Sequence, residues 1–94
     1  MCTYLTTTAS VAGSAYAGDD WFAVDRAVVY FDHPQDAPLD HALCIDVWGT
    51  GERVAVELDA SSARALAEAI LATLDSDEVA LLMSEQARKL VTKS

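Results

Sequence analysis

The chain has 94 residues, of which 15 are acidic and 6 basic, so its formal charge is −9, and 52% of the residues are hydrophobic. This length predicts a single domain over residues 1–94, and the hydrophobic content predicts a globular chain rather than a disordered one. The negative charge argues against nucleic acid and anionic membrane surfaces as partners, because both are negatively charged themselves.

The start of the chain predicts a cytoplasmic location. Met1 to Thr8 contain neither the basic segment nor the apolar segment of a signal peptide, and no apolar run in the chain is long enough to span a bilayer. In that compartment Cys2 and Cys44 are expected as thiols rather than as a disulfide.

The residues up to Leu58 have the patterns of β-strands. Thr3 to Val11 alternate between polar and apolar residues, and the Gly, Ser and Asp residues of 13–20 are typical of a turn. Further strands are predicted over residues 21–32, 42–48 and 53–58, with a short hairpin connection at Gly49 to Glu52. The strands over 21–32 and 42–48 carry apolar residues on both faces, which predicts that both faces are covered.

After Asp59 the apolar residues recur with the period of a helix. Those of 59–74 form one stripe, comprising Ala63, Leu66, Ala67, Ile70, Leu71 and Leu74. Asp59 or Ser61 can cap this helix, and Asp75 and Ser76 mark a break before a second helix over 76–92. The apolar stripe is expected to pack on the sheet.

These elements predict an α+β fold. Residues 1–58 form a mainly antiparallel four-stranded sheet, followed by one packed helix and a second, C-terminal helix. One strong helix leaves the second face of the central strands, with Val28, Tyr30, Cys44 and Trp48, without a cover. We therefore expect the chain to associate with itself, as a homodimer or a larger closed assembly.

The loop between the two central strands contains both histidines of the chain and both prolines, Pro34 and Pro38. Proline cannot donate a hydrogen bond to a strand ladder, so the strands are expected to stop near His33 and resume near His41. The hydrophobic pattern favours a register with His33 opposite His41 and Phe31 opposite Leu43, because a one-residue slip would pair apolar with polar residues. This register places the two imidazoles about 5 Å apart.

Two neighbouring imidazoles could bind one metal ion, with Asp32 as a further ligand or as the group that orients a ring N–H. Zinc is the first expectation, and copper or nickel the next. The alternative is a turn whose aspartates and histidines bond to the loop backbone. The spacing of His33 and His41 is not a recognised metal-binding motif, so the sequence leaves both interpretations open.

Each cysteine has its own interpretation. Removal of Met1 would leave Cys2 with a free amine and a thiol, which together can chelate a metal or act as a nucleophile, and Cys2 is therefore the candidate catalytic residue. The alternative is an ordinary residue at the start of a strand. Cys44 lies within a predicted strand and is expected to be a small buried hydrophobic residue.

Several short blocks follow one another in a characteristic order. They are Met1-Cys2-Thr3, Asp20-Trp21-Phe22, Tyr30-Phe31-Asp32-His33-Pro34, Ala37-Pro38-Leu39, His41-Ala42-Leu43 with Ile45-Asp46, and Arg53 to Leu58 leading into Ser62 to Leu66. With these blocks, residues 1–74 resemble a small family of uncharacterised actinobacterial proteins. The resemblance implies no activity and no catalytic residue.

Three functions remain compatible with the sequence. The first is a small acidic cytoplasmic homo-oligomer with a binding or scaffolding role, and the second is a metal-dependent protein or small enzyme that uses His33 and His41. The third is thiol chemistry at Cys2. The chain has no Gly-rich phosphate loop, G-x-S-x-G, C-x-x-C or H-E-x-x-H motif. No substrate or small-molecule ligand can be inferred from the sequence.

Overall fold

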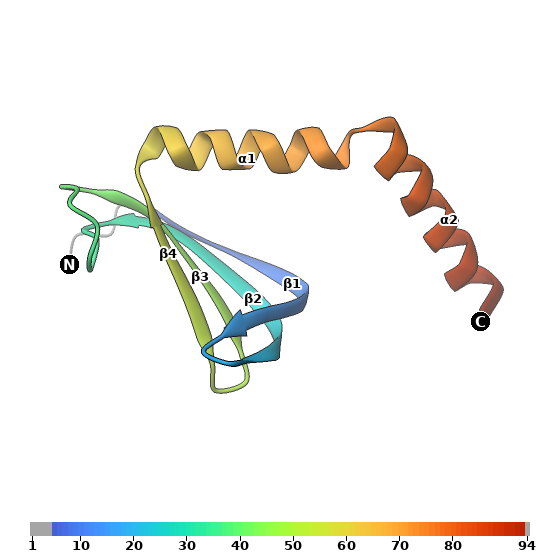
Figure 1. The fold of residues 1–94 in the computed structure, drawn as a ribbon, viewed down its shortest axis with the longest axis horizontal. Coiled ribbons are helices and arrows are strands. Elements are labelled where there is room, and N and C mark those ends of the chain that lie inside the picture. Colours follow the sequence, from blue (N-terminus) through green and yellow to red (C-terminus); the bar gives the residue numbers. More distant parts are fainter. Residues whose placement is uncertain (1–4, 94) are drawn as a thin grey trace. The chain divides into compact units, whose positions relative to one another are not determined.

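The computed structural model describes the backbone of residues 5–93 and the side chains of residues 5–86. The strands are β1 (Thr6–Ala17), β2 (Asp20–Asp32), β3 (Ala42–Gly49) and β4 (Arg53–Leu58), and the helices are α1 (Ala60–Leu74) and α2 (Asp77–Lys93) (Figure 1). The α+β prediction is confirmed. The chain divides into two compact units, a sheet unit that ends at Ser61 and a helix unit that begins at Ser62.

The four strands form one antiparallel sheet in the order β1-β2-β3-β4. Phe31 lies opposite Leu43, Val29 opposite Ile45 and Ala27 opposite Val47. The register predicted from the hydrophobic pattern is therefore confirmed for the two central strands.

The first hairpin differs from the prediction. The turn predicted over residues 13–20 is wrong, because β1 continues to Ala17, which pairs with Asp20. The chain reverses at Gly18 and Asp19, and the φ of Gly18 is 67°, a left-handed conformation that glycine adopts at little cost. The small residues of 13–17 can therefore continue the strand. The first residues of the predicted strand, Thr3 and Tyr4, lie outside the described residues.

The sheet has two faces of different character. We call outer face the mainly apolar side of the sheet. Its residues are Ala27, Val29, Phe31, Leu43, Ile45, Val47, Val54, Val56 and Leu58 on β2 to β4, with Thr7 and Ala9 on β1. We call inner face the opposite side, which carries Arg26, Val28, Tyr30, Cys44, Asp46, Trp48, Arg53, Ala55 and Glu57.

The inner face is the more buried of the two along β3. Ala42 is 0%, Cys44 3% and Asp46 7% exposed, whereas Val29 and Val56 on the outer face are 36% and 39% exposed. The sheet is curled, so that parts of β1 and β4 lie within 8 Å of each other between Cα atoms, and the loop after β2 bonds to Glu57 on the inner face. The inner face, which we expected to need a cover, is therefore partly covered within the sheet unit itself.

The helix unit begins and continues as the sequence predicts. The Ser61 hydroxyl donates to Asp59 Oδ1 at 3.2 Å next to the start of α1, and Ser76 Oγ accepts the N–H of Val79 at 3.3 Å as the cap of α2. No side chain of α1, all of whose residues the structure describes, is buried. The packing of its apolar stripe stays a prediction. Among the described helices, none has the length and apolar character required to cross a membrane.

Candidate functional site

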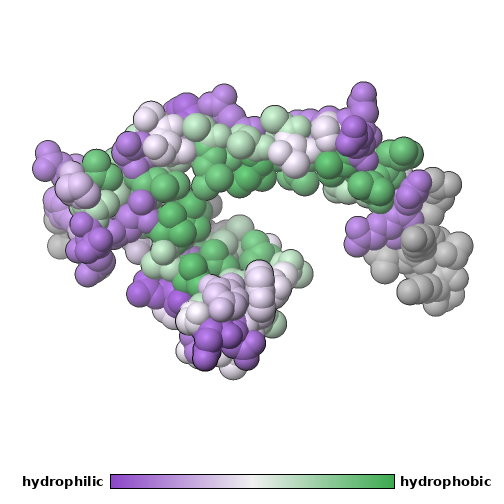
Figure 2. Space-filling view, viewed as in Figure 1, coloured by the Kyte–Doolittle hydropathy of each residue, from purple (hydrophilic) through white to green (hydrophobic). Residues whose placement is uncertain are grey.

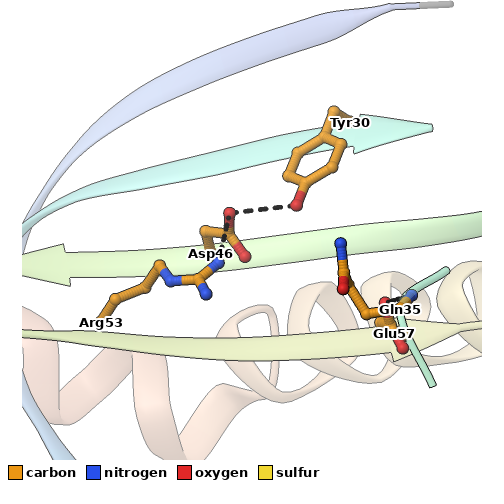
Figure 3. Close-up of polar contacts among 5 residues, drawn as sticks. All are labelled: Tyr30, Gln35, Asp46, Arg53 and Glu57. Atoms are coloured by element: carbon orange, nitrogen blue, oxygen red, sulfur yellow. Dashed lines mark hydrogen bonds and ion pairs between the residues drawn. The ribbon is translucent and has the colours of Figure 1, made fainter. Parts of the chain in front are cut away.

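The loop between β2 and β3 is anchored by the carboxylate of Glu57. This carboxylate accepts the backbone N–H groups of Gln35 (Figure 3), Asp36 (3.0 Å) and Ala37 (3.3 Å). The bonds from Gln35 and Asp36, the two largest causes, hold the pKa of Glu57 below its usual value, because they stabilise the charged form. A side chain of β4 therefore fixes a loop that begins more than 20 residues earlier in the chain.

The two histidines lie at the base of this loop, at the end of the outer face. The centroids of the His33 and His41 rings are 4.8 Å apart and the ring planes differ by 24°. His41 also stacks against Phe31, with centroids 5.8 Å apart. The predicted proximity of the imidazoles is confirmed, and Phe31, His41 and His33 form a continuous stack.

The loop backbone orients the His33 ring. Nδ1 of His33 lies 2.8 Å from the backbone oxygen of Asp40. A carbonyl oxygen can accept a hydrogen bond but cannot donate one, so Nδ1 is the donor in this contact. The N–H of His33 donates to Oδ1 of Asp32 at 2.7 Å, which fixes the start of the loop.

The ring spacing suits a metal ion, whereas the ring orientation does not. Two imidazoles on one tetrahedral zinc ion, with Zn–N bonds of about 2.0 Å, have centroids roughly 5 Å apart. His33 and His41 match this spacing, but their nearly parallel planes do not direct both Nε2 lone pairs to one point. Binding would require one ring to turn about its Cβ–Cγ bond. Within the described part of the chain, no group of three His, Cys, Asp or Glu residues is arranged to hold a metal ion.

A second polar cluster lies on the inner face. Oδ2 of Asp46 accepts the hydroxyl of Tyr30 at 3.1 Å and pairs with Nη1 of Arg53 at 3.2 Å (Figure 3). Burial, followed by the hydrogen bond and the charge of Asp46, raises the pKa of Tyr30 to about 12. Oδ1 of Asp46 is buried without a hydrogen-bond partner among the described residues.

Trp48 adds to this cluster on the same face. The guanidinium carbons of Arg26 and Arg53 lie 5.1 and 5.4 Å from the centre of its ring system, within the range of a cation–π contact. Arg53 therefore contacts both Asp46 and Trp48. This cluster joins side chains of β2, β3 and β4 across the sheet.

The role of Asp46 was not predicted from the sequence. The available signal was an acidic residue within the apolar run from Ala42 to Trp48, on the same side as Tyr30 and Cys44. A carboxylate is rarely buried unless it is paired, so this position predicts a partner such as the arginine of the next strand.

The structure describes Cys44 but not Cys2. Cys44 is buried, its thiol lies 3.7 Å from the backbone oxygen of Ala42, and burial raises the pKa of the Cys44 thiol. A thiol in this state is a poor nucleophile, which agrees with the prediction of a small buried residue. Cys2, the candidate catalytic residue, lies outside the described residues, and its role stays a prediction.

The carboxylates of Asp46 and Glu57 are both bonded to other groups of the chain, and such bonds fix strands and loops in place. His33 and His41 place two imidazole rings side by side at the end of the outer face.

Comparisons with known proteins locate the chain in a family. Neither the curated proteins nor the solved structures contain a match. A family model matches residues 1–84, which include the sheet, α1 and the first part of α2. The chain belongs to this family, a family of unknown function (DUF6295).

Proposed function

We propose that the protein is a small cytoplasmic homo-oligomer with a binding or scaffolding role, and that copies associate through the outer face of the sheet. The observation that carries this proposal is the location of the apolar residues. Ala42 and Cys44 are the buried hydrophobic residues of the described chain, and no large side chain in that part is fully buried. The apolar residues of the outer face, in contrast, are partly exposed.

The distribution of charge supports association through this face in particular. None of the outer-face residues is charged, although the chain as a whole carries a formal charge of −9. Two copies repel each other over most of their surface, so an uncharged apolar face is where contact costs least. The same charge argues against nucleic acid and anionic membranes as partners.

Light scattering on two matched variants tests this proposal. Val56→Lys places a charge on the outer face, and Ala55→Lys places the same charge on the neighbouring residue of the inner face. We expect the wild type and Ala55→Lys to be oligomers at tens of micromolar, and Val56→Lys to be a monomer. A wild-type monomer at that concentration contradicts the proposal.

The histidine pair favours a second candidate function, the binding of a divalent transition metal, with zinc first and copper or nickel next. The supporting observations are the 4.8 Å ring spacing and the contact of His33 Nδ1 with the backbone oxygen of Asp40, in which Nε2 takes no part. In this candidate His33 and His41 are the ligands, and Asp32 supports them through the backbone of His33.

Titration calorimetry with zinc, copper and nickel, on protein purified without an affinity tag, tests the metal candidate. His33→Ala and His41→Ala should each abolish binding, whereas Asp32→Asn should weaken it. Affinity no tighter than roughly 100 µM for all three metals would exclude a dedicated site.

A further inference from the structure

The inner face of the sheet has a row of small side chains between two rows that contain larger ones. In the strand register, Asp46 of β3 lies between Val28 of β2 and Ala55 of β4. Thr8 of β1 continues this row opposite Val28. The flanking rows are Ser10, Arg26, Trp48 and Arg53 on one side and Thr6, Tyr30, Cys44 and Glu57 on the other. A small molecule therefore meets the least bulk directly beside Asp46.

One oxygen of the Asp46 carboxylate lacks a donor. Oδ1 is buried and has no hydrogen-bond partner among the described residues, whereas Oδ2 contacts both Tyr30 and Arg53. Figure 3 shows both contacts at the same oxygen. A buried acceptor without a donor is unfavourable, because it has lost its hydrogen bonds to water and gained none in return. Oδ1 is therefore placed to accept a hydrogen bond from a bound molecule.

The positive charges beside Asp46 exceed its single negative charge. Arg53 pairs with Asp46 at 3.2 Å. Arg26 contacts the Trp48 ring and forms no ion pair with any residue whose side chain the structure describes. Two arginines and one carboxylate give this cluster a net charge of +1, in a chain whose formal charge is −9. The planar guanidinium fork of an arginine fits the two oxygens of a carboxylate.

The unpaired arginine and the unpartnered oxygen are close enough to hold one small molecule. Arg26 is the diagonal neighbour of Asp46 across β2 and β3, and such neighbours, about 7–8 Å apart, are within reach of long side chains. The guanidinium of Arg53 is already bonded to the other oxygen of Asp46. A cation and a free acceptor therefore lie side by side, which suits a ligand whose anionic group and donor are on adjacent atoms.

We propose that this part of the inner face binds a small 2-hydroxy carboxylic acid. The carboxylate of the ligand pairs with Arg26 and with a free N–H of Arg53, and its hydroxyl donates to Oδ1 of Asp46. A monovalent anion neutralises the cluster, whereas a zwitterionic amino acid leaves its net charge unchanged. Because Oδ1 is buried, binding requires a neighbouring side chain to move, and the long, flexible side chain of Arg53 is bonded to Asp46.

The end of the sheet next to the arginines suits a charged ligand. Trp48 and Arg53 flank the turn between β3, which ends at Gly49, and β4, which begins at Arg53. Figure 2 shows hydrophilic residues gathered at the end of the sheet unit where Figure 1 has this turn. A carboxylate held at this end remains partly hydrated, which lowers the free energy needed to bring it out of water.

Titration of the isotope-labelled protein by NMR with four small molecules, at constant ionic strength, tests the inference. Lactate carries both groups, propionate lacks the hydroxyl, lactamide lacks the charge, and free alanine has an ammonium group instead of the hydroxyl. We expect lactate to cause saturable shifts of the Trp48 indole N–H with a Kd below about 5 mM, and the other three to bind at least about fivefold more weakly. The indole N–H of Trp21, which contacts Tyr16, should not shift.

Two matched variants test the role of the unpaired cation. Arg26→Gln removes it from the inner face, and Arg64→Gln removes the same charge from α1, so the net charge of the chain changes equally. Arg26→Gln should weaken lactate binding at least about tenfold, because it removes a charge-assisted pair, whereas Arg64→Gln should bind lactate as the wild type does. Circular dichroism must show that both variants are folded. The comparison of lactate with propionate tests the role of Asp46 without any substitution.

The inference fails if lactate causes no saturable shift up to about 50 mM, if propionate or alanine binds as tightly as lactate, or if Arg26→Gln keeps the wild-type affinity. It concerns the inner face of a single sheet and goes beyond the proposed self-association, which uses the outer face. A monomeric wild type that binds lactate as described would contradict the association and support this site, so the two proposals fail separately.

Discussion

At the scale of single residues, Asp46 has the most unusual surroundings in the sheet. It is 7% exposed, and its Oδ2 atom is bonded to both Tyr30 and Arg53. A buried carboxylate is tolerated when its hydrogen bonds are made, and removal of one partner leaves part of the desolvation cost unbalanced. Tyr30 and Arg53 are therefore expected to contribute to stability through Asp46.

The substitution Tyr30→Phe tests this role. It removes one bond from Asp46 and should lower the free energy of unfolding by about 1–2 kcal/mol. Tyr16→Phe is the matched control, because Tyr16 is 52% exposed and its hydroxyl can bond to water. The free energies come from urea denaturation at neutral pH. An equal effect of both substitutions would show that the bond between Tyr30 and Asp46 contributes nothing.

The pKa of Tyr30 makes a separate prediction about alkaline pH. This pKa is raised from 10.0 to about 12 in the folded chain, whereas the unfolded chain retains the ordinary value. The unfolded state therefore loses its proton first. The stability that depends on this shift is fully present below pH 10 and is lost as the pH rises from 10 to about 12. Urea denaturation across this range should show a smaller loss of stability for Tyr30→Phe than for the wild type.

At the scale of elements, the bonds between Glu57 and the loop after β2 connect a strand to the segment that carries the histidines. The carboxylate must be charged to hold three backbone N–H groups, and its pKa is lowered. The contribution is therefore present above the unfolded pKa of about 4.3 and is lost as the pH falls through the lower folded value.

We expect Glu57→Gln to release the loop. The amide protons of Gln35, Asp36 and Ala37 should be protected from hydrogen exchange in the wild type and lose this protection in the variant. Glu52→Gln, in the exposed hairpin turn, is the matched control and should leave the three amides protected. Protection that survives Glu57→Gln would assign the order of the loop to its prolines instead.

Gly49 lies at the end of the pairing between β2 and β3, where the backbone of β2 leaves no room for a side chain. A Cβ atom at this position would lie 2.0 Å from the backbone oxygen of Ala23 and 2.7 Å from the Phe22 ring. Gly49→Ala should therefore destabilise the fold by about 3 kcal/mol or more in urea denaturation. Gly13→Ala is the control, because nothing lies within 4 Å of its added Cβ, and it should change stability by less than about 1 kcal/mol. Equal stability of the two variants would show that β2 and β3 can separate at Gly49 without cost.

The strands and their register could be predicted where apolar residues follow a regular pattern. The features that were not predicted depend on structure that no local sequence pattern reveals. The pairs Phe31 with Leu43 and Val29 with Ile45 follow from one rule, that apolar residues share a face. The continuation of β1 through Gly13 was missed because small residues are common in turns and are also tolerated in an exposed strand. The role of Glu57 was missed because its partners lie about 20 residues away in sequence.

At the scale of the whole molecule, the sheet buries the face that carries the polar cluster and leaves its mainly apolar face more exposed. Asp46 is on the more buried face, and Val29 and Val56 are on the more exposed one. An antiparallel sheet with one covered face normally buries its apolar face and exposes its polar face to water. The association that we propose through the outer face would bury these apolar residues between copies.

The stability of such an assembly must depend on protein concentration. If the folded chain is stabilised by its partner, a higher concentration favours the associated state by mass action, and the melting temperature rises. We expect the melting temperature of the wild type and of Ala55→Lys to increase between about 5 and 500 µM, because a hundredfold change in concentration corresponds to roughly 2.7 kcal/mol. Val56→Lys, which places a charge on the outer face, should melt at a lower temperature that does not change with concentration. Scanning calorimetry at several concentrations provides the measurement. A wild-type melting temperature that is constant over this range would mean that each chain buries its apolar surface alone, and the outer face would then have to be covered by a segment of the same chain.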